Sequence, residues 1–306
     1  MTTKAYRTCP LCEATCGLEL TLEGDRVRVI RGDRDNVFSS GFICPKGTTL
    51  GRLHDDPDRL RVPLLKRVGE WETVSWPEAY AFIAERFEAV VGAHGRNAVG
   101  VYIGNPNAHQ LDSALALRPF IRALGTRNVF SASTLDQMPK HVSCGYMFGH
   151  PGTIPVPDLD RTDYLLILGA NPYESNGSLA TAPDWPGRLE AIRRRGGRVV
   201  VVDPRLTRTA ANSDLHLPIR PGTDAILLVA MINHLFANDL VDLGHLEGKV
   251  AGLDGVREAT SAITVEQAAA VCGIDAGLII RAAEELAGAE RGCVYGRIGT
   301  HTVRFG

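Results

Sequence analysis

Four cysteines near the start of the chain have the types and spacing of a metal-centre ligand set. Three of them form the pattern Cys9-x2-Cys12-x3-Cys16, and the fourth is Cys44. Four thiolates can hold an iron–sulfur cluster or a structural zinc ion. Zinc sites usually come as two tight pairs, so a tight triplet with one remote ligand favours the cluster. Lys46 follows in Cys44-Pro45-Lys46-Gly47, either as a solvated surface lysine or as a residue that tunes the cluster or links it to a neighbouring cofactor.

Composition and charge exclude several other classes of protein. The net charge of -2 excludes a strongly basic nucleic-acid-binding protein, and no apolar run approaches the ~18 residues of a membrane span. The first ten residues, MTTKAYRTCP, contain neither an apolar signal segment nor a twin arginine, so we expect a cytoplasmic protein. In that compartment clustered cysteines bind metal more often than they form disulfides.

The elements around these cysteines must bring Cys44 back to the first three. Apolar and polar residues alternate over 18–23 and again over 26–29, with Gly24-Asp25 between the two runs. This pattern is typical of a β-hairpin with one buried face. Such a hairpin would return the chain from the cysteine triplet towards Cys44.

The centre of the chain alternates strands with helices. Continuous apolar runs at 164–168 and 199–202 predict buried strands, and helices are expected over 185–195 and 224–236. A further strand is expected at 293–295, and Ser75, Thr264 and Asp275 are expected to cap additional helices. These features predict a parallel sheet covered on both faces, which binds ligands at the carboxyl ends of its strands.

Polar residues follow the predicted strands at those ends. The segment 169–177 contains glycine, asparagine and serine, which suit a pyrophosphate. Asp203 could accept a hydrogen bond from a ribose or a guanine, and Arg205 could pair with a phosphate. The same residue types are also common in ordinary turns, so both interpretations stand on this pattern alone.

Taken together, these motifs resemble the molybdopterin oxidoreductases that bind two molybdopterin guanine dinucleotides, which include formate dehydrogenases and nitrate reductases. The resemblance extends over essentially the whole chain. It rests on four motifs in order: the cysteine set ending in Cys44-Pro45-Lys46-Gly47, Gly169-Ala170-Asn171-Pro172, Val201-Val202-Asp203-Pro204-Arg205 and Pro221-Gly222-Thr223-Asp224.

The resemblance implies an α/β fold with a small β-rich [4Fe–4S] domain at the N-terminus. Doubly wound parallel-sheet dinucleotide-binding domains follow, one of them incomplete. The implied bounds are 1–60 for the cluster domain, 61–132 for the first half of a split α/β domain, and 133–306 for an inserted dinucleotide-binding domain. Members of the family that are catalytically complete are much longer than 306 residues. The chain is therefore expected to correspond to their N-terminal portion.

The resemblance also implies the cofactors and the residues that hold them. Cys9, Cys12, Cys16 and Cys44 would ligate a [4Fe–4S] cluster, and Lys46 would relay electrons between the cluster and the nearer pterin. Molybdopterin guanine dinucleotide would carry molybdenum or tungsten. The residues expected to contact the dinucleotide are Asn105, Gly169, Asn171, Glu174, Ser175, Asp203, Pro204, Arg205, Gly222 and Asp224.

The family places a protein ligand to the metal shortly before the 164–168 strand, and Asp136 occupies that position. A carboxylate is a suitable hard ligand for a high-valent metal. Cys144 is the alternative, but it lies eight residues further on in an expected helix, where a free cysteine is usually a small buried residue. Formate dehydrogenases have a histidine after the ligand. Here Gln137 cannot titrate, which speaks against formate oxidation, although His141 lies one helical turn away.

Two functions follow from these features. In the first, the chain is the N-terminal part of an oxidoreductase that performs two-electron chemistry on a small redox substrate and passes electrons through the cluster to a partner protein. The remaining domains would then be encoded directly downstream or lie on another chain. In the second, the chain is a non-catalytic iron–sulfur fragment or subunit that transfers electrons and binds at most one pterin dinucleotide.

Overall fold

The computed structural model describes residues 1–108, 110–180 and 182–304. The chain divides into two compact units, Met1–Thr134 and Leu135–Gly306. The finer domain bounds at residues 60 and 132 stay a prediction.

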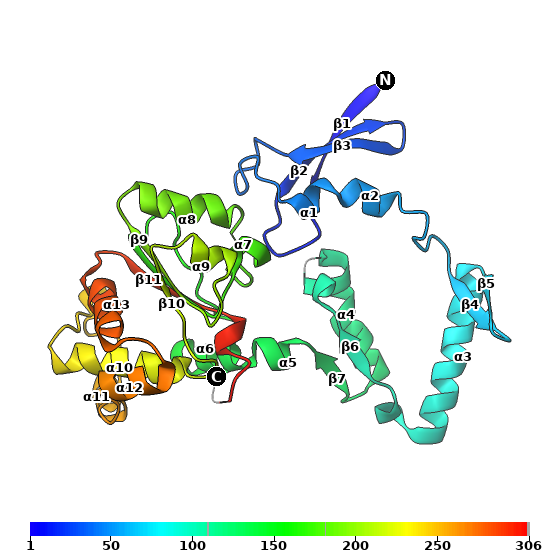
Figure 1. Cartoon of the computed structure of the whole chain (residues 1–306). Helices are drawn as coiled ribbons and strands as arrows, with labels where there is room; N and C mark the ends of the chain where they lie inside the picture. The colour runs from blue at the N-terminus through cyan, green and yellow to red at the C-terminus, as the bar shows by residue number, and fades with distance from the viewer. Residues whose placement is uncertain (109, 181, 305–306) are drawn as a thin grey trace. The chain divides into compact units, whose positions relative to one another are not determined.

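The first unit begins with a three-stranded antiparallel sheet in the order β1-β2-β3 (Figure 1). Its strands are β1 (Thr2–Thr8), β2 (Gly17–Glu23) and β3 (Arg26–Gly32). The predicted hairpin is confirmed as β2 and β3, which turn at Gly24-Asp25. The short helices α1 (Pro45–Thr48) and α2 (Leu50–His54) follow. A small apolar core containing Cys9, Cys16 and Leu18 forms in this part of the unit.

The rest of the first unit is thinly packed. Two strands, β6 and β7, pair in parallel, and β4 and β5 form a separate hairpin. The helix α3, all of which the structure describes, contains no buried residue. The elements are β4 (Leu64–Arg67), β5 (Glu70–Thr73), α3 (Trp76–His94), η1 (Arg96–Ala98), β6 (Val101–Ile103), η2 (Asn105–Ala108), α4 (Leu111–Leu124) and β7 (Val129–Ser131). The short helix α5 (Ser133–Asp136) leads into the second unit.

The second unit is built on a four-stranded parallel sheet in the order β10-β9-β8-β11. The strands are β8 (Tyr164–Leu168), β9 (Arg198–Val202), β10 (Leu215–Leu217) and β11 (Gly292–Gly296). The strand order reverses at β8, because the chain proceeds from β8 to β9 and β10 on one side and later returns to β11 on the other. Such a reversal opens a crevice beyond the carboxyl ends of the strands, where ligands bind.

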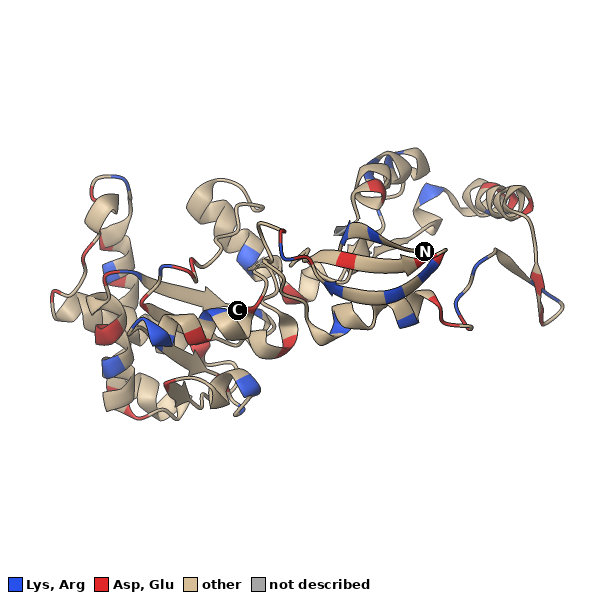
Figure 2. Ribbon diagram, turned by 90° about the horizontal axis from the view of Figure 1, so that it is seen from above, with Lys and Arg blue, Asp and Glu red and all other residues tan. Residues whose placement is uncertain are grey.

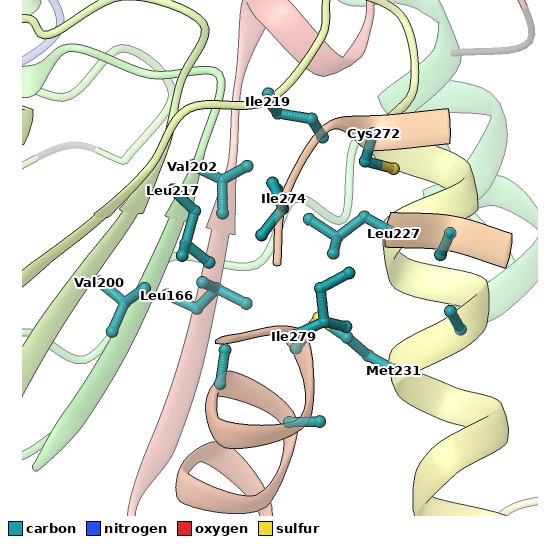
Figure 3. Packing of buried hydrophobic residues seen from close by; sticks show 14 of the residues in the cluster. Leu166, Val200, Val202, Leu217, Ile219, Leu227, Met231, Cys272, Ile274 and Ile279 are labelled. Carbon is teal, nitrogen blue, oxygen red and sulfur yellow. The ribbon is translucent and has the colours of Figure 1, made fainter. Parts of the chain in front are cut away.

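Helices cover both faces of this sheet, as the alternating strands and helices predict. Residues 166, 200 and 202 point to a core with α10, α12 and α13 (Figure 3). Residues 165, 167, 199 and 201 point to a second core with α8 and α9. The helices are α6 (Met138–Phe148), α7 (Pro172–Ser175), α8 (Trp185–Arg194), α9 (Arg208–Ala211), α10 (Asp224–Ala237), η3 (Gly244–Leu246), α11 (Leu253–Thr260), α12 (Val265–Cys272), α13 (Ala276–Gly288) and η4 (Ile298–Thr300).

The three predicted helix caps are present. Thr264 and Gln267 form a full capping box at α12, and the Asp275 side chain accepts a hydrogen bond from the Leu278 N–H at α13. The Ser75 hydroxyl accepts from the Glu78 N–H at α3. Each cap satisfies an N–H group that has no partner within its helix.

Acidic and basic residues are interspersed along the ribbon (Figure 2), in keeping with the small net charge. Within the described parts of the chain, no helix combines the length and the apolar character that crossing a membrane would require.

Candidate metal and dinucleotide site

The cysteine triplet lies in a closed loop between β1 and β2. Thr8 and Gly17 face each other as the last register pair of the two strands, and the Cys9 N–H donates to the Cys16 carbonyl at 2.8 Å. Within the loop, Thr15 takes a left-handed conformation and its N–H donates to the Cys12 carbonyl at 3.2 Å. The antiparallel pairing therefore fixes Cys9 and Cys16 side by side, with Cys12 in the loop between them.

Cys44 enters from the far end of the hairpin, as predicted. It occupies the N-cap position of α1, but its side chain makes no capping hydrogen bond. Behind it, α1 packs closely, since a Cβ on Gly47 would lie 2.8 Å from Ile43 Cγ1 and 4.0 Å from Cys9 Sγ. The thiol of Cys44 is thus free to serve as a ligand beside the triplet.

Burial and the neighbouring cysteines both raise the pKa values of Cys9 and Cys16. Burial raises the pKa of Cys9, and the charges of Cys12 and Cys44 raise it further. Burial also raises the pKa of Cys16 to about 11, again reinforced by the other three cysteines. The four thiols are therefore close enough to interact electrostatically. Binding of a metal centre would have to displace their protons.

The donor set suits an iron–sulfur cluster, which four cysteine thiolates hold. Cys9 and Cys16 belong to a small apolar core, and Cys12 packs against it. Among the described residues, no group of three or more His, Cys, Asp or Glu side chains surrounds a single ion site. Lys46 lies exposed on α1, and its role as a relay stays a prediction.

At the carboxyl edge of the second unit's sheet, two glycines bring the chain after β8 against the chain after β11. The Gly299 N–H donates to the Gly169 carbonyl at 3.0 Å. A Cβ on Gly169 would lie 2.8 Å from Gly299 Cα, and the φ of Gly169 is +56°. Only glycine permits both the conformation and this close approach. The sequence analysis singled out Gly169 but not its partner Gly299.

Three of the predicted dinucleotide residues shape the loop after β8. The Asn171 Oδ1 accepts from the Thr209 hydroxyl at 2.7 Å. The Ser175 Oγ accepts from the Gly177 N–H at 3.3 Å, and Glu174 pairs with Arg208 at 3.0 Å. These bonds position the loop, whereas contact with a dinucleotide stays a prediction. Asn105 lies in η2 of the first unit.

Two carboxylates lie close together beyond β9 and at the start of α10. The Asp203 Oδ1 accepts from the Arg205 N–H at 2.9 Å, which forms a tight turn through the exposed Pro204. Asp224 is buried, and burial raises its pKa, to which the charge of Asp203 adds. Gly222 precedes it with φ +81°. The pair presents acceptors, and when protonated a donor, to a ligand at this edge.

Asp136 lies at the end of α5, and its Oδ1 is buried without any hydrogen-bond partner. A buried carboxylate oxygen with no partner is costly unless it binds a cation. The structure thus shows the orphaned acceptor that a ligand to a metal would present. The alternative, Cys144, is buried within α6, as the sequence suggested.

Three cationic or titratable groups missed by the sequence analysis lie around Asp136. Arg297 Nη1 and His301 Nδ1 both donate to the Asp136 main-chain carbonyl, at 3.2 and 3.1 Å. Lys140 Nζ donates to the Gly296 carbonyl at 3.2 Å. Burial and the neighbouring positive charges lower the pKa of both Lys140 and His301. The only signal was the run Gly296-Arg297-Ile298-Gly299 directly after a predicted strand.

A cavity of about 760 Å³ opens beside these groups, between α6, the start of α10 and the segment after β11. Lys140, Cys144, Asp224, His301 and Arg304 are among its lining residues. Its volume lies in the range of sites for cofactors and other small molecules. Gly222 and Asp224, two of the predicted dinucleotide residues, therefore line the same cavity as Lys140 and His301.

Two family models match the chain. Residues 59–272 match the family model "Molybdopterin oxidoreductase", and residues 3–55 match "Molybdopterin oxidoreductase Fe4S4 domain". The predicted cofactors, a [4Fe–4S] cluster and molybdopterin with molybdenum or tungsten, are those of the two matched domains.

Individual relatives and one solved structure show how far the similarity extends. The chain is 30% identical, over 94% of its length, to the F420-dependent formate dehydrogenase subunit alpha of Methanocaldococcus jannaschii, and covers 41% of that protein. It is 29% identical, over 86% of its length, to a nitrate reductase of Symbiobacterium thermophilum, and covers 34% of it. The structure of acetylene hydratase from Pelobacter acetylenicus aligns with a TM-score of 0.81 at 26% identity, covering 98% of this chain and 41% of that one.

The chain thus spans about two fifths of the length of relatives such as the first. The match to the oxidoreductase family model nevertheless covers more than half of the chain, and the Fe4S4 domain precedes it. The chain belongs to the molybdopterin oxidoreductase family.

Proposed function

We propose that the chain forms the cluster-bearing and dinucleotide-binding part of a molybdenum or tungsten oxidoreductase with two molybdopterin guanine dinucleotides. The enzyme would carry out two-electron redox chemistry on a small substrate. Electrons would then pass through the [4Fe–4S] cluster to a partner protein. The observation that carries the proposal is the buried, unpartnered Oδ1 of Asp136.

In this proposal the bound metal centre supplies the redox chemistry, and the chain binds and orients it. Asp136 ligates the metal through its carboxylate. The four cysteines would ligate the cluster beside the small apolar core that contains Cys9 and Cys16, and Lys46 would couple it to a pterin. Asp203 and Asp224 would accept hydrogen bonds from the dinucleotide, and the close contact of Gly169 with Gly299 holds the chain after β8 against the chain after β11.

The substrate is not formate in this proposal. Gln137 lies next to the candidate ligand and cannot titrate. His141 Nδ1 lies 2.8 Å from the Pro151 carbonyl, and Nε2 lies 3.3 Å from the Gln137 side chain. Because a carbonyl only accepts, Nδ1 donates to Pro151, and the Gln137 atom that faces Nε2 is the side-chain oxygen Oε1. Both side chains are thus engaged with each other.

The cluster is tested by iron content after anaerobic purification of the chain. We expect about four irons per chain, and Cys16→Ser should lower that content because one thiolate is lost. The matched control is Cys293→Ser, which changes a half-buried cysteine of the other unit. Equal iron content in the two variants would contradict the assignment.

The metal ligand is tested separately by X-ray absorption at the molybdenum or tungsten edge. Asp136→Ala should remove one oxygen neighbour of the metal, whereas Asp254→Ala, at an exposed carboxylate in the first turn of α11, should not. A chain that carries iron but neither molybdenum nor tungsten would instead support the electron-transfer fragment.

A further inference from the structure

Arg297 is buried, with 4% of its surface exposed, although it carries a charge. It follows β11 directly, and its N–H donates to the Leu168 carbonyl at the end of β8 at 3.1 Å. Its guanidinium bridges two other segments. Nη1 donates to the Asp136 carbonyl at 3.2 Å, and Nη2 donates to the Ser178 hydroxyl at 2.8 Å. One side chain therefore ties α5 and the loop after α7 to the carboxyl edge of the sheet.

The carbonyl of Asp136 receives a second donor from the same turn. His301 Nδ1 lies 3.1 Å from it, and the turn is closed by the Thr300 N–H, which donates to the Arg297 carbonyl at 2.9 Å. Two donors from a short 3-10 turn therefore hold one main-chain oxygen. Since the side chain of Asp136 is attached to that peptide, the orientation of its carboxylate depends on these two hydrogen bonds.

The hydrogen bonds that Arg297 donates do not require a charged side chain. None of the ion pairs within 4.0 Å that the described residues form involves Arg297, and its Nε has no hydrogen-bond partner. Lys140 is a second basic group close to Arg297, whose charge lowers the Lys140 pKa in addition to burial. A neutral donor could hold a carbonyl without the cost of burying a charge, and buried charges are normally paired. The uncompensated charge therefore points to an anionic group bound in front of Asp136.

We infer that Arg297 is a positioning residue for the metal centre. It fixes the main chain at Asp136 so that the carboxylate faces the metal, and its charge balances the anionic ligands of that metal. This inference rests on the proposed role of Asp136. It adds a residue outside the motifs that identify the family.

Arg195 provides a matched control within the same unit. Its guanidinium also donates to main-chain carbonyls, those of Leu159 and Thr162, each at 2.7 Å. It precedes β9 and so lies at the opposite, amino edge of the sheet. It is more exposed than Arg297, and its loss removes similar bonds away from the candidate site.

The first readout is hydrogen exchange of the metal-free full chain. Arg297→Met should speed exchange in peptides covering 133–141 about tenfold, because hydrogen bonds from a charged donor are lost. Exchange in the central strands β8 and β9 should stay unchanged. Arg195→Met should affect the segment around residues 159–162 and leave 133–141 as in the parent chain. Unchanged exchange at 133–141 in Arg297→Met would overturn the inference, whether or not the chain binds metal.

The second readout is molybdenum or tungsten per chain. Arg297→Met should lower it about tenfold, as loss of outer-shell support does in other metal sites. Arg297→Lys keeps the charge but loses the planar guanidinium that donates from two nitrogens to two acceptors. The metal content of this variant should therefore lie between those of Arg297→Met and the parent chain. Metal content that falls equally in Arg195→Met and Arg297→Met would show general destabilisation and overturn the inference. If Asp136→Ala keeps the oxygen neighbour while Arg297→Met loses metal, the ligand assignment fails and the charge role of Arg297 stands.

Discussion

At the scale of single residues, the pair Gly169 and Gly299 shows how tightly the carboxyl edge of the sheet is built. The φ of Gly169 is +56°, and a Cβ there would lie 2.8 Å from both Gly299 Cα and the Thr300 nitrogen. Those atoms belong to the main chain, so they cannot move aside as a flexible side chain could. The contact also places Arg297 and η4 against the end of β8.

The substitution Gly169→Ala should therefore destabilise the fold in two ways, through the left-handed conformation and through the contact with Gly299. Gly244→Ala should destabilise it through the conformation alone. Gly244 has φ +49° and nothing within 4 Å of an added Cβ. Both variants should lose about 1 kcal/mol of unfolding free energy from the left-handed conformation, and Gly169→Ala should lose about 1–3 kcal/mol more from overpacking. Urea unfolding of the full chain measures both values. Equal losses would mean that the two glycine segments separate easily.

Residue types identified only part of this site in advance. Cysteine spacing indicated four candidate ligands of a metal centre, because this spacing favours an iron–sulfur cluster over a zinc site. Arg297 and His301 gave no such signal, because their importance comes from a turn that forms after β11 and meets Asp136 across 161 and 165 positions of sequence. Contacts of that range depend on the register of the sheet, which a local pattern does not specify.

At the scale of elements, the strands and helices with a strong hydrophobic pattern were the ones that the sequence predicted. The buried strands β8 and β9 and the helices α8 and α10 carry long apolar runs or stripes, and they lie close to the expected bounds. By contrast, β1 has one half-buried residue among seven and was not expected. Its main chain pairs with β2 along its whole length, and that pairing leaves no mark in side-chain hydrophobicity.

The start of α10 leads to a prediction on pH. The negative charge of Asp224 is favoured by the helix N-terminus, but burial and the charge of Asp203 outweigh this and raise its pKa above 3.8. The folded chain then holds this proton more tightly than the unfolded chain. Its contribution to stability is complete below pH 3.8 and is lost as the pH rises through the folded-state pKa.

Asp224→Asn should accordingly raise the unfolding free energy of the metal-free chain at neutral pH and flatten its decline above about pH 4. Asp254→Asn is the matched control, an exposed carboxylate in the first turn of α11. It should instead lower stability by about 0.3–1 kcal/mol, because only the helix-end interaction is lost. Urea titrations over this pH range distinguish the two signs, and a destabilised Asp224→Asn at neutral pH would refute the argument.

At the scale of the whole molecule, the two units differ in what stabilises them. The second unit has apolar clusters on both faces of its sheet. Among the described residues of the first unit, the buried apolar side chains form one small cluster, which contains Cys9 and Cys16 and has Cys12 packed against it. Its helix α3 and strands β6 and β7 leave large apolar side chains exposed, among them Trp76, Tyr80, Tyr102 and Phe130. A unit with so little buried apolar surface gains much of its stability from whatever it binds.

This difference predicts two thermal transitions that respond differently to iron. A cluster that binds the folded first unit stabilises that unit by mass action, so its removal with a chelator should lower one transition by about 5 °C or more. The transition of the second unit should stay where it is, since the four cysteines lie outside that unit. Differential scanning calorimetry of the full chain before and after iron removal makes the measurement. Cys16→Ser should match the iron-depleted curve, whereas Cys293→Ser should keep its response to iron. A single transition that shifts as a whole would show that the two units unfold together.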